Sequence, residues 1–170
     1  MTSRTLAATA AFTLCVAALQ AQNPMSTEAK QAYTGVKNNL TKMAEKMPEE
    51  HYAFKPVPEI RTFGQLVAHV ADAQLRNCSA AKGSPMQGNA ASKTSKADLV
   101  AALKASFEVC DSAFEGLTDA SAAEMVTSPR GQRSRLGILT GNTTHSNEEY
   151  GYMAVYLRLK GIVPPSSEGR

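Results

Sequence analysis

Four segments of this chain repeat apolar side chains every three or four residues, which is the spacing of one face of an α-helix. In the first segment the apolar positions are Ala29, Tyr33, Val36, Leu40, Met43 and Met47. Ser26 is placed to cap the start of this helix, and Pro48 requires it to end. No segment shows the alternation of apolar and polar residues that is typical of a half-buried strand. The pattern therefore predicts an all-α fold.

The next two helices are predicted between residues that favour helix ends. Thr62 is a good N-cap for the second helix, and Gly83 and Pro85 end it. Its apolar face comprises Phe63, Leu66, Val67, Val70 and Ala73. Ser95 caps the third helix, whose apolar residues have a heptad-like spacing: Leu99, Leu103, Phe107, Cys110, Phe114 and Leu117. Three prolines between residues 48 and 58 exclude regular helix from the connection between the first and second helices.

The fourth helix is predicted to begin near Ser134 or Leu136 and to run to Lys160, where Gly161 stops it. None of these four amphipathic helices can bury its apolar face alone, so the simplest fold is a four-helix bundle. A chain of 170 residues suits one domain with a single core. We therefore expect one bundle domain over residues 22–170.

The first 21 residues differ in composition from the rest of the chain. Arg4 is their only charged residue, and residues 6–19 form an apolar run. This run is shorter than the roughly 20 residues that a membrane-spanning helix needs, and Ala21 offers a cleavage site. Residues 1–21 are therefore interpreted as a cleaved signal peptide. We expect the mature protein to be exported to the periplasm or the extracellular space, with no membrane association after cleavage.

Composition excludes some classes of protein and of partner. Charged residues are 19% and apolar residues 43% of the chain, which are ordinary globular values and exclude a disordered or fibrous protein. The net charge of +3 is spread along the chain, and no basic run is long enough to follow a phosphate backbone. Nucleic acid is therefore not expected as a partner.

Cleavage of the leader would remove Cys15 and leave Cys78 and Cys110. In a compartment that permits disulfides, this pair could bridge the second and third helices. The two residues fit equally well as small buried hydrophobic side chains, because free cysteine is often buried. The sequence leaves both interpretations open.

The predicted fourth helix contains a polar run, residues 140–149, that has no large apolar side chain. Such a run is costly inside a bundle, because buried polar groups need partners and a buried unpaired carboxylate costs several kcal/mol. His145 and Glu149 are four residues apart, so both side chains can reach one point. His69 lies on the second helix beside its apolar face, whereas His51 falls in the proline-rich connection.

Two imidazoles and a carboxylate that converge in a bundle can hold a divalent metal and leave coordination positions open for water or substrate. A different interpretation is that His145 and Glu149 form a solvated surface pair and that His69 is a hydrogen-bonded core residue. On spacing alone this second interpretation is the more frequent one, because the pair spacing is common by chance.

Three sequence blocks resemble the DinB-like superfamily of metal-dependent four-helix-bundle proteins, in particular its exported members. The blocks are MPEEHYAFKPVPEIRTFGQLVAHVADAQLRNCSAAKG, SFEVCDSAF and HSNEEYGYMAVYLRLKGIVPPSS. The resemblance implies a bundle in which three histidines hold a divalent metal, one from the second helix and two, four residues apart, from the last. His69 matches the first of these and His145 the second. Glu149 stands where the family usually has the third histidine.

A carboxylate can still ligate zinc, nickel, manganese or iron, so the implied ligands are His69, His145 and Glu149. The resemblance implies a metal-dependent enzyme of the hydrolase or thiol S-transferase type, in which the metal activates a water or a thiol. It fixes no small-molecule substrate, and it leaves open a homodimer, since relatives are often dimers. The alternative is a non-catalytic envelope bundle with a degenerate site, acting as a binding or stress-related module.

Four further residues have both a functional and a structural interpretation. Glu148 or Tyr150 could orient groups around the metal, and Arg61 or Arg158 could bind an anionic substrate. The preferred interpretations are a solvent-facing glutamate, a core tyrosine and arginines that cap helices or pair with carboxylates. Export also disfavours a thiol transferase, because low-molecular-weight thiols are scarce outside the cytoplasm. An enzyme of unspecified reaction is therefore preferred.

Overall fold

The structure is a computed structural model that describes residues 23–128 and 131–169. The predicted signal peptide, residues 1–21, lies outside the described residues. The long helices are α1 (Pro24–Lys46), α2 (Phe63–Ala81), α3 (Lys96–Glu115) and α5 (Arg135–Leu159). Three 3-10 turns are η1 (Glu49–His51), η2 (Ala90–Ser92) and η3 (Pro165–Ser167). Within the described ranges, no helix combines the length and the apolar character that crossing a membrane requires.

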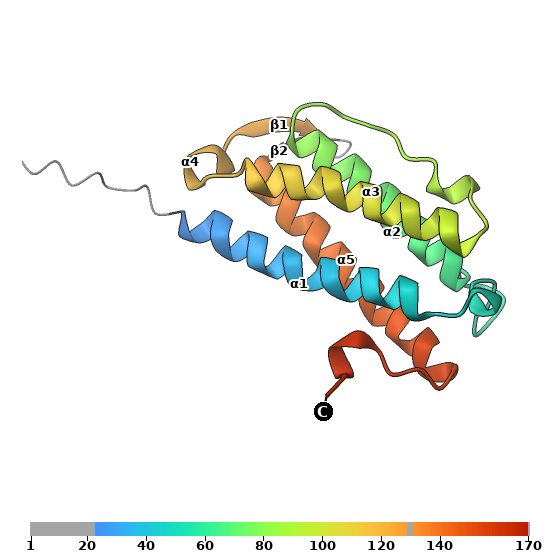
Figure 1. Ribbon diagram of the computed structural model, residues 1–170. Helices are drawn as coiled ribbons and strands as arrows, with labels where there is room; N and C mark the ends of the chain where they lie inside the picture. Colours follow the sequence, from blue (N-terminus) through green and yellow to red (C-terminus); the bar gives the residue numbers. More distant parts are fainter. Residues whose placement is uncertain (1–22, 129–130, 170) are drawn as a thin grey trace, which may run out of the picture.

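The long helices form a four-helix bundle, as predicted. Each of them packs against two others, in the cyclic order α1, α3, α2, α5. Figure 1 shows that α2 and α3 run in the same direction, because segment 82–95 returns along the bundle before α3 begins. The largest fully buried apolar side chains come from all four helices and their immediate flanks: Phe63, Phe107, Phe114, Leu40, Met43, Met47, Leu99, Leu103, Leu139, Met153 and Leu157. The apolar faces read from the sequence therefore form the core.

Local sequence signals define most of the helix ends. The side chains of Thr62, Ser95 and Ser134 each accept a hydrogen bond from the backbone amide three residues later, so all three are N-caps. The caps at Thr62 and Ser95 were predicted, and Ser134 is one of the two predicted starts of the last helix. Gly161 follows the end of α5 with a φ of 71°, the left-handed conformation that commonly terminates a helix.

The N-terminus of α1 differs from the prediction. Ser26 is not its N-cap, because the helix begins at Pro24 and Ser26 lies within the first turn. The carboxylate of Asp119 accepts hydrogen bonds from the backbone amides of Met25 and Ser26, at 3.2 and 2.8 Å. Asp119 lies 93 residues beyond Ser26 in sequence. A tertiary contact therefore satisfies the first amides of α1, which no neighbouring residue could reveal.

A β-hairpin is the second difference from the prediction. Strand β1 (Met125–Ser128) pairs antiparallel with β2 (Gly131–Ser134), and the short helix α4 (Asp119–Ala122) precedes them. The expectation that no segment forms a strand is therefore wrong. Strands of four residues are too short to show a clear alternation of apolar and polar side chains. The hairpin packs against α2 and α5, near the start of α5 (Figure 1).

Cys78 on α2 and Cys110 on α3 form a disulfide, with their Cα atoms 5.0 Å apart. Both residues are fully buried, so the bridge is part of the core. The structure thus decides in favour of the bridge between the two interpretations that the sequence left open. Because the two residues are separated by 32 positions, the bond is expected to stabilise the fold by about 3–4 kcal/mol through the entropy of the unfolded chain.

Candidate metal centre

The interface between α2 and α5 contains a buried polar network. The side-chain amide of Gln74 makes two hydrogen bonds. Its Nε2 donates to Oγ of Ser146 at 3.1 Å, and its Oε1 accepts from Nδ2 of Asn142. Asn77 donates to Oδ1 of Asn142 at 3.0 Å. Gln74, Asn142 and Ser146 are buried, and burying such groups without partners would be costly. Sequence reasoning missed this network, although the spacing of Asn142 and Ser146 by four residues in the polar run is a signal for it.

The remaining polar side chains of this interface converge on one point. Three side chains form one group: His69 on α2, and His145 and Glu149 on α5. Their potential ligand atoms all lie within 4.8 Å of one another. The Nε2 atoms of the two histidines are 3.0 Å apart. Oε1 of Glu149 lies 3.5 Å from Nε2 of His69 and 3.6 Å from Nε2 of His145. The structure therefore brings together all three residues that the sequence singled out.

These distances fit a shared cation. Two atoms bound at about 2.1 Å from one ion lie about 3.0 Å apart at a right angle and about 3.4 Å apart at the tetrahedral angle. The two distances from Glu149 to the imidazoles exceed those of good hydrogen bonds. Glu149 is 5% exposed, and no partner for its Oε2 atom occurs among the described residues. A buried carboxylate that lacks a partner destabilises the fold. A cation between this carboxylate and the two imidazoles would offset that cost.

The local electrostatics agree with this donor set. Burial lowers the pKa of His69, and the positive charges of Arg61, His145 and Arg76 lower it further. The neutral imidazole is therefore favoured, which is the form that binds metals. Burial raises the pKa of Glu149, and the positive charge of Arg61 opposes that shift. A divalent cation would favour the ionised carboxylate, because opposite charges stabilise each other strongly in a buried site.

The other candidate residues divide into two groups. Glu148 is exposed and accepts a hydrogen bond from a tyrosine hydroxyl at 2.7 Å. Tyr150 is buried and bonds through its hydroxyl to Ser166, while Arg158 donates to a serine of the same C-terminal segment at 2.9 Å. Glu148 and Tyr150 have the structural roles that were preferred, whereas Arg158 bonds to a serine hydroxyl and pairs with no carboxylate among the described residues. Arg61 likewise takes part in no ion pair among the described residues, but it lines a hollow beside Glu149.

The largest hollow beside the candidate ligands has a volume of about 740 Å³ and is lined by Glu149. We call it the apolar hollow, because Ile60, Leu66 and Val155 form part of its wall. Arg61 also lines it, and the Tyr156 hydroxyl donates to the backbone carbonyl of Arg61 at 2.6 Å. A ligand with an apolar part can therefore approach Glu149 from this side.

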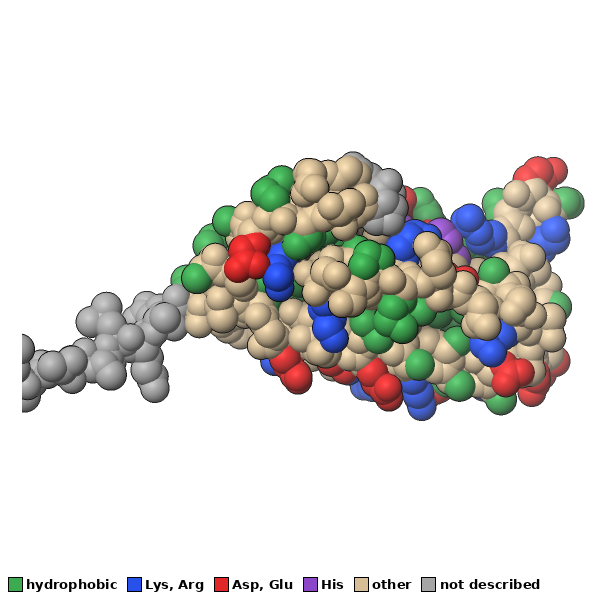
Figure 2. Space-filling view, turned by 90° about the horizontal axis from the view of Figure 1, so that it is seen from above, with side chains coloured by type: hydrophobic (Ala, Val, Ile, Leu, Met, Phe, Trp, Pro, Cys, Tyr) green, Lys and Arg blue, Asp and Glu red, His purple; other side chains and the backbone are tan. Residues whose placement is uncertain are grey.

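Two smaller hollows adjoin the histidines. The middle hollow, of about 400 Å³, is lined by His69, Arg61 and Arg76. The arginine hollow, of about 230 Å³, is lined by His69, His145, Arg76 and Arg133. Figure 2 shows a histidine side chain at the surface with Lys or Arg side chains on both sides. Solvent can thus reach the candidate ligands, and sequence reasoning missed both Arg76 and Arg133.

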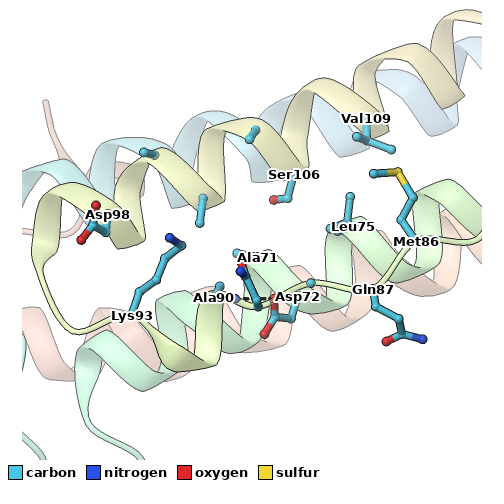
Figure 3. A pocket seen from close by; sticks show the side chains of 15 residues that line it. Ala71, Asp72, Leu75, Met86, Gln87, Ala90, Lys93, Asp98, Ser106 and Val109 are labelled. Carbon is cyan, nitrogen blue, oxygen red and sulfur yellow. Dashed lines mark hydrogen bonds between the residues drawn. The ribbon is translucent and has the colours of Figure 1, made fainter.

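A fourth hollow, of about 430 Å³, lies between α2, α3 and segment 86–93 (Figure 3). The part of its wall that the two helices form is mostly apolar, with Ala71, Leu75, Ala101, Ala102, Ala105 and Val109. Asp72 accepts hydrogen bonds from the backbone amides of Ala90 and Ala91, at 2.9 and 3.2 Å, and so holds this segment against α2. None of the candidate metal ligands lines this hollow. It is therefore separate from the metal centre.

Known structures share this fold. A DinB-like protein from Bacillus cereus is 18% identical, with a TM-score of 0.71 over 82% of this chain and 95% of its own. A DinB-like protein from Bacillus subtilis is 21% identical, with a TM-score of 0.64 over 79% and 92%. A mycothiol-dependent maleylpyruvate isomerase is 14% identical, with a TM-score of 0.60, and the match covers 78% of this chain and 60% of that one.

Sequence comparison identifies the family directly. Among curated proteins, none matches the chain. The sequence model of the DinB superfamily matches residues 32–153, which include most of the bundle and all three candidate ligands. The resemblance to the DinB-like superfamily is confirmed, and this chain belongs to the DinB superfamily.

Proposed function

We propose that this protein is an exported metal-dependent enzyme whose divalent ion is held by His69, His145 and Glu149. The observation that carries the proposal is the buried Glu149 carboxylate, which lies 3.5 and 3.6 Å from two imidazole nitrogens. Two nitrogen ligands and one oxygen ligand suit zinc, nickel, manganese or iron. Three protein ligands leave coordination positions for water or substrate, which is typical of catalytic rather than structural sites.

The protein's own residues give this site its geometry. The hydrogen bonds of Gln74 to Asn142 and Ser146 hold α2 against α5 and thereby set the separation of His69 and His145. A bound divalent ion would lower the pKa of a water or thiol in contact with it and so supply a nucleophile at neutral pH. The apolar hollow beside Glu149 offers room for an apolar part of a small-molecule substrate.

Water is the preferred nucleophile in this proposal. The Cys78–Cys110 disulfide supports export, because disulfides persist mainly in oxidising compartments. Low-molecular-weight thiols are scarce there, which favours a hydrolase. A thiol S-transferase is the second candidate reaction, and one observation favours it: a solved structure with the same fold is named as a mycothiol-dependent isomerase.

Metal analysis of the mature chain, purified without a histidine tag, tests the proposal. We expect stoichiometric divalent metal after dialysis, and loss of that metal in His69→Gln and in His145→Gln. His51→Gln is the matched control, because His51 lies in η1 and outside the ligand group. Metal-free wild-type protein, or full metal content in His69→Gln, would overturn the proposal and favour a non-catalytic binding module. Intact-mass analysis of the exported protein tests cleavage after Ala21.

A further inference from the structure

The arginine hollow lies between α2, the β-hairpin and the first half of α5. Its charged and titratable lining residues are Arg76, Arg133, His69 and His145, and no acidic side chain from residues 23–128 or 131–169 lines it. The other two hollows of the metal centre differ in this respect, since each includes at least one carboxylate in its wall. The arginine hollow is therefore the part of the site with an unbalanced positive charge.

Arg133 is held in a defined position in this hollow. Its Nη2 donates to the carbonyl oxygen of Gly137 at 2.8 Å. Gly137, Gly141 and His145 are spaced by four residues and so share one stripe of α5. A Cβ atom at Gly141 would lie 3.4 Å from Nη2 and 3.7 Å from Nη1 of Arg133. The guanidinium therefore packs against α5 one turn before His145, and a guanidinium has five N–H donors, only one of which makes this bond.

Arg76 faces the same hollow from α2. It is half-buried and takes part in no ion pair among the described residues. The carboxylate one turn before it, Asp72, is engaged by the backbone amides of Ala90 and Ala91 instead. Arg76 lines this hollow together with His69 and His145, which places it beside the candidate ligands. A half-buried cation without a counter-charge favours binding of an anion.

We propose that the arginine hollow is an anion subsite, in which Arg76 and Arg133 bind a carboxylate or phosphate group of the substrate. The inference rests on the proposed metal centre, because it places the reacting part of that substrate beside His69 and His145. Guanidinium groups match the planar, two-oxygen geometry of carboxylate and phosphate. The hollow's volume of about 230 Å³ accommodates such a group, since one water occupies about 30 Å³ in the liquid.

Calorimetric titration of the full mature, oxidised chain tests this inference. Inorganic phosphate and succinate are the probes, at constant ionic strength, with zinc-loaded and with metal-free protein. We expect at least one probe to bind both forms, and which one binds better distinguishes a phosphate from a carboxylate substrate. Arg76→Gln and Arg133→Gln should each weaken binding at least about tenfold. Arg158→Gln is the matched control and should leave the affinity unchanged.

Measurements on the same variants test the anion subsite and the proposed metal centre independently of each other. Zinc content should stay stoichiometric in Arg76→Gln and Arg133→Gln, since neither residue belongs to the ligand group. Absence of binding, or binding that requires zinc and is indifferent to both arginine substitutions, would overturn the anion subsite. Arginine-dependent binding by a chain that takes up no zinc even when zinc is supplied would support the subsite and overturn the metal centre. Circular dichroism of each variant establishes that a loss of binding does not come from unfolding.

Discussion

The interface between α1 and α3 and the interface between α2 and α5 lie on opposite sides of the bundle and differ in chemistry. Between α1 and α3, the ring of Tyr33 stacks on Phe114 with centroids 4.3 Å apart and also contacts Phe107. The Tyr33 hydroxyl is satisfied by the Phe107 carbonyl and the Asp111 carboxylate. Between α2 and α5, buried amide, hydroxyl and carboxylate groups and two half-buried imidazoles lie beside a single aromatic pair of the described residues, Phe63 and Tyr156.

The difference between the two interfaces indicates which one stabilises the fold and which one binds ligands. The α1–α3 interface is complete as it stands, because its rings are packed and its buried hydroxyl is bonded. The α2–α5 interface leaves Oε2 of Glu149 without a partner in the described part of the chain, so a bound cation would stabilise it. Substitutions at the first interface should therefore affect folding, and substitutions at the second should affect ligand binding.

The largest effect is expected in the apolar interface. Phe107→Ala should lower the free energy of unfolding by about 3–5 kcal/mol, because it leaves a cavity where a ring is now 1% exposed. Urea unfolding followed by circular dichroism measures this change. The metal content of the folded fraction should be unchanged. A loss below about 1 kcal/mol would contradict the assignment of stability to this interface.

The disulfide should have the next largest effect. Cys78→Ala combined with Cys110→Ala should cost about 3–4 kcal/mol of stability, and wild-type protein reduced in denaturant should refold to a similarly less stable state. Because the bridge joins α2 to α3 and not to α5, the metal affinity of the folded variant should stay close to that of wild type. Two titratable thiols in unreduced, unfolded wild-type protein would refute the bridge.

A third pair of substitutions tests the polar interface. Glu149→Ala should reduce metal affinity at least about 100-fold, or about 2.7 kcal/mol, because it removes one of the three proposed ligands. Glu149→His restores the ligand that the family usually has, and it should retain metal and shift the preference towards zinc. Competition with a chromogenic chelator measures both affinities. Equal affinities in wild type and Glu149→Ala would place the carboxylate outside the ligand set.

The substitution with the smallest expected effect should stabilise the protein instead of destabilising it. In metal-free protein, Glu149→Gln should raise the free energy of unfolding by about 1 kcal/mol, because it removes a buried charge that lacks a partner. Unfolding in the presence of a chelator measures this gain, and excess zinc should reverse the order of stability of the two proteins. If Glu149→Gln destabilises the metal-free protein, the carboxylate makes a stabilising contact within the apoprotein, and the contrast between the two interfaces fails.

Most of the secondary structure could be predicted, because its signals are local. Thr62, Ser95 and Ser134 bond to amides of their own first turn, so their role is visible in a few neighbouring residues. The i,i+4 spacing also placed His145 and Glu149 together on one helix face. Their pairing with His69, by contrast, was one of two open interpretations of the sequence, and only the family resemblance favoured it, because spacing alone cannot relate two helices.

Only the tertiary structure decided the contacts between distant segments. It placed Asp119 at the start of α1, closed the bridge between Cys78 and Cys110, and paired Gln74 with the polar run of α5. It also brought Arg133 from the hairpin to the hollow that Arg76 lines. A sequence by itself determines helix faces and caps because those depend on neighbours within a few residues. Which faces meet depends on the packing of the whole core, where many side chains from all four helices must fit at once.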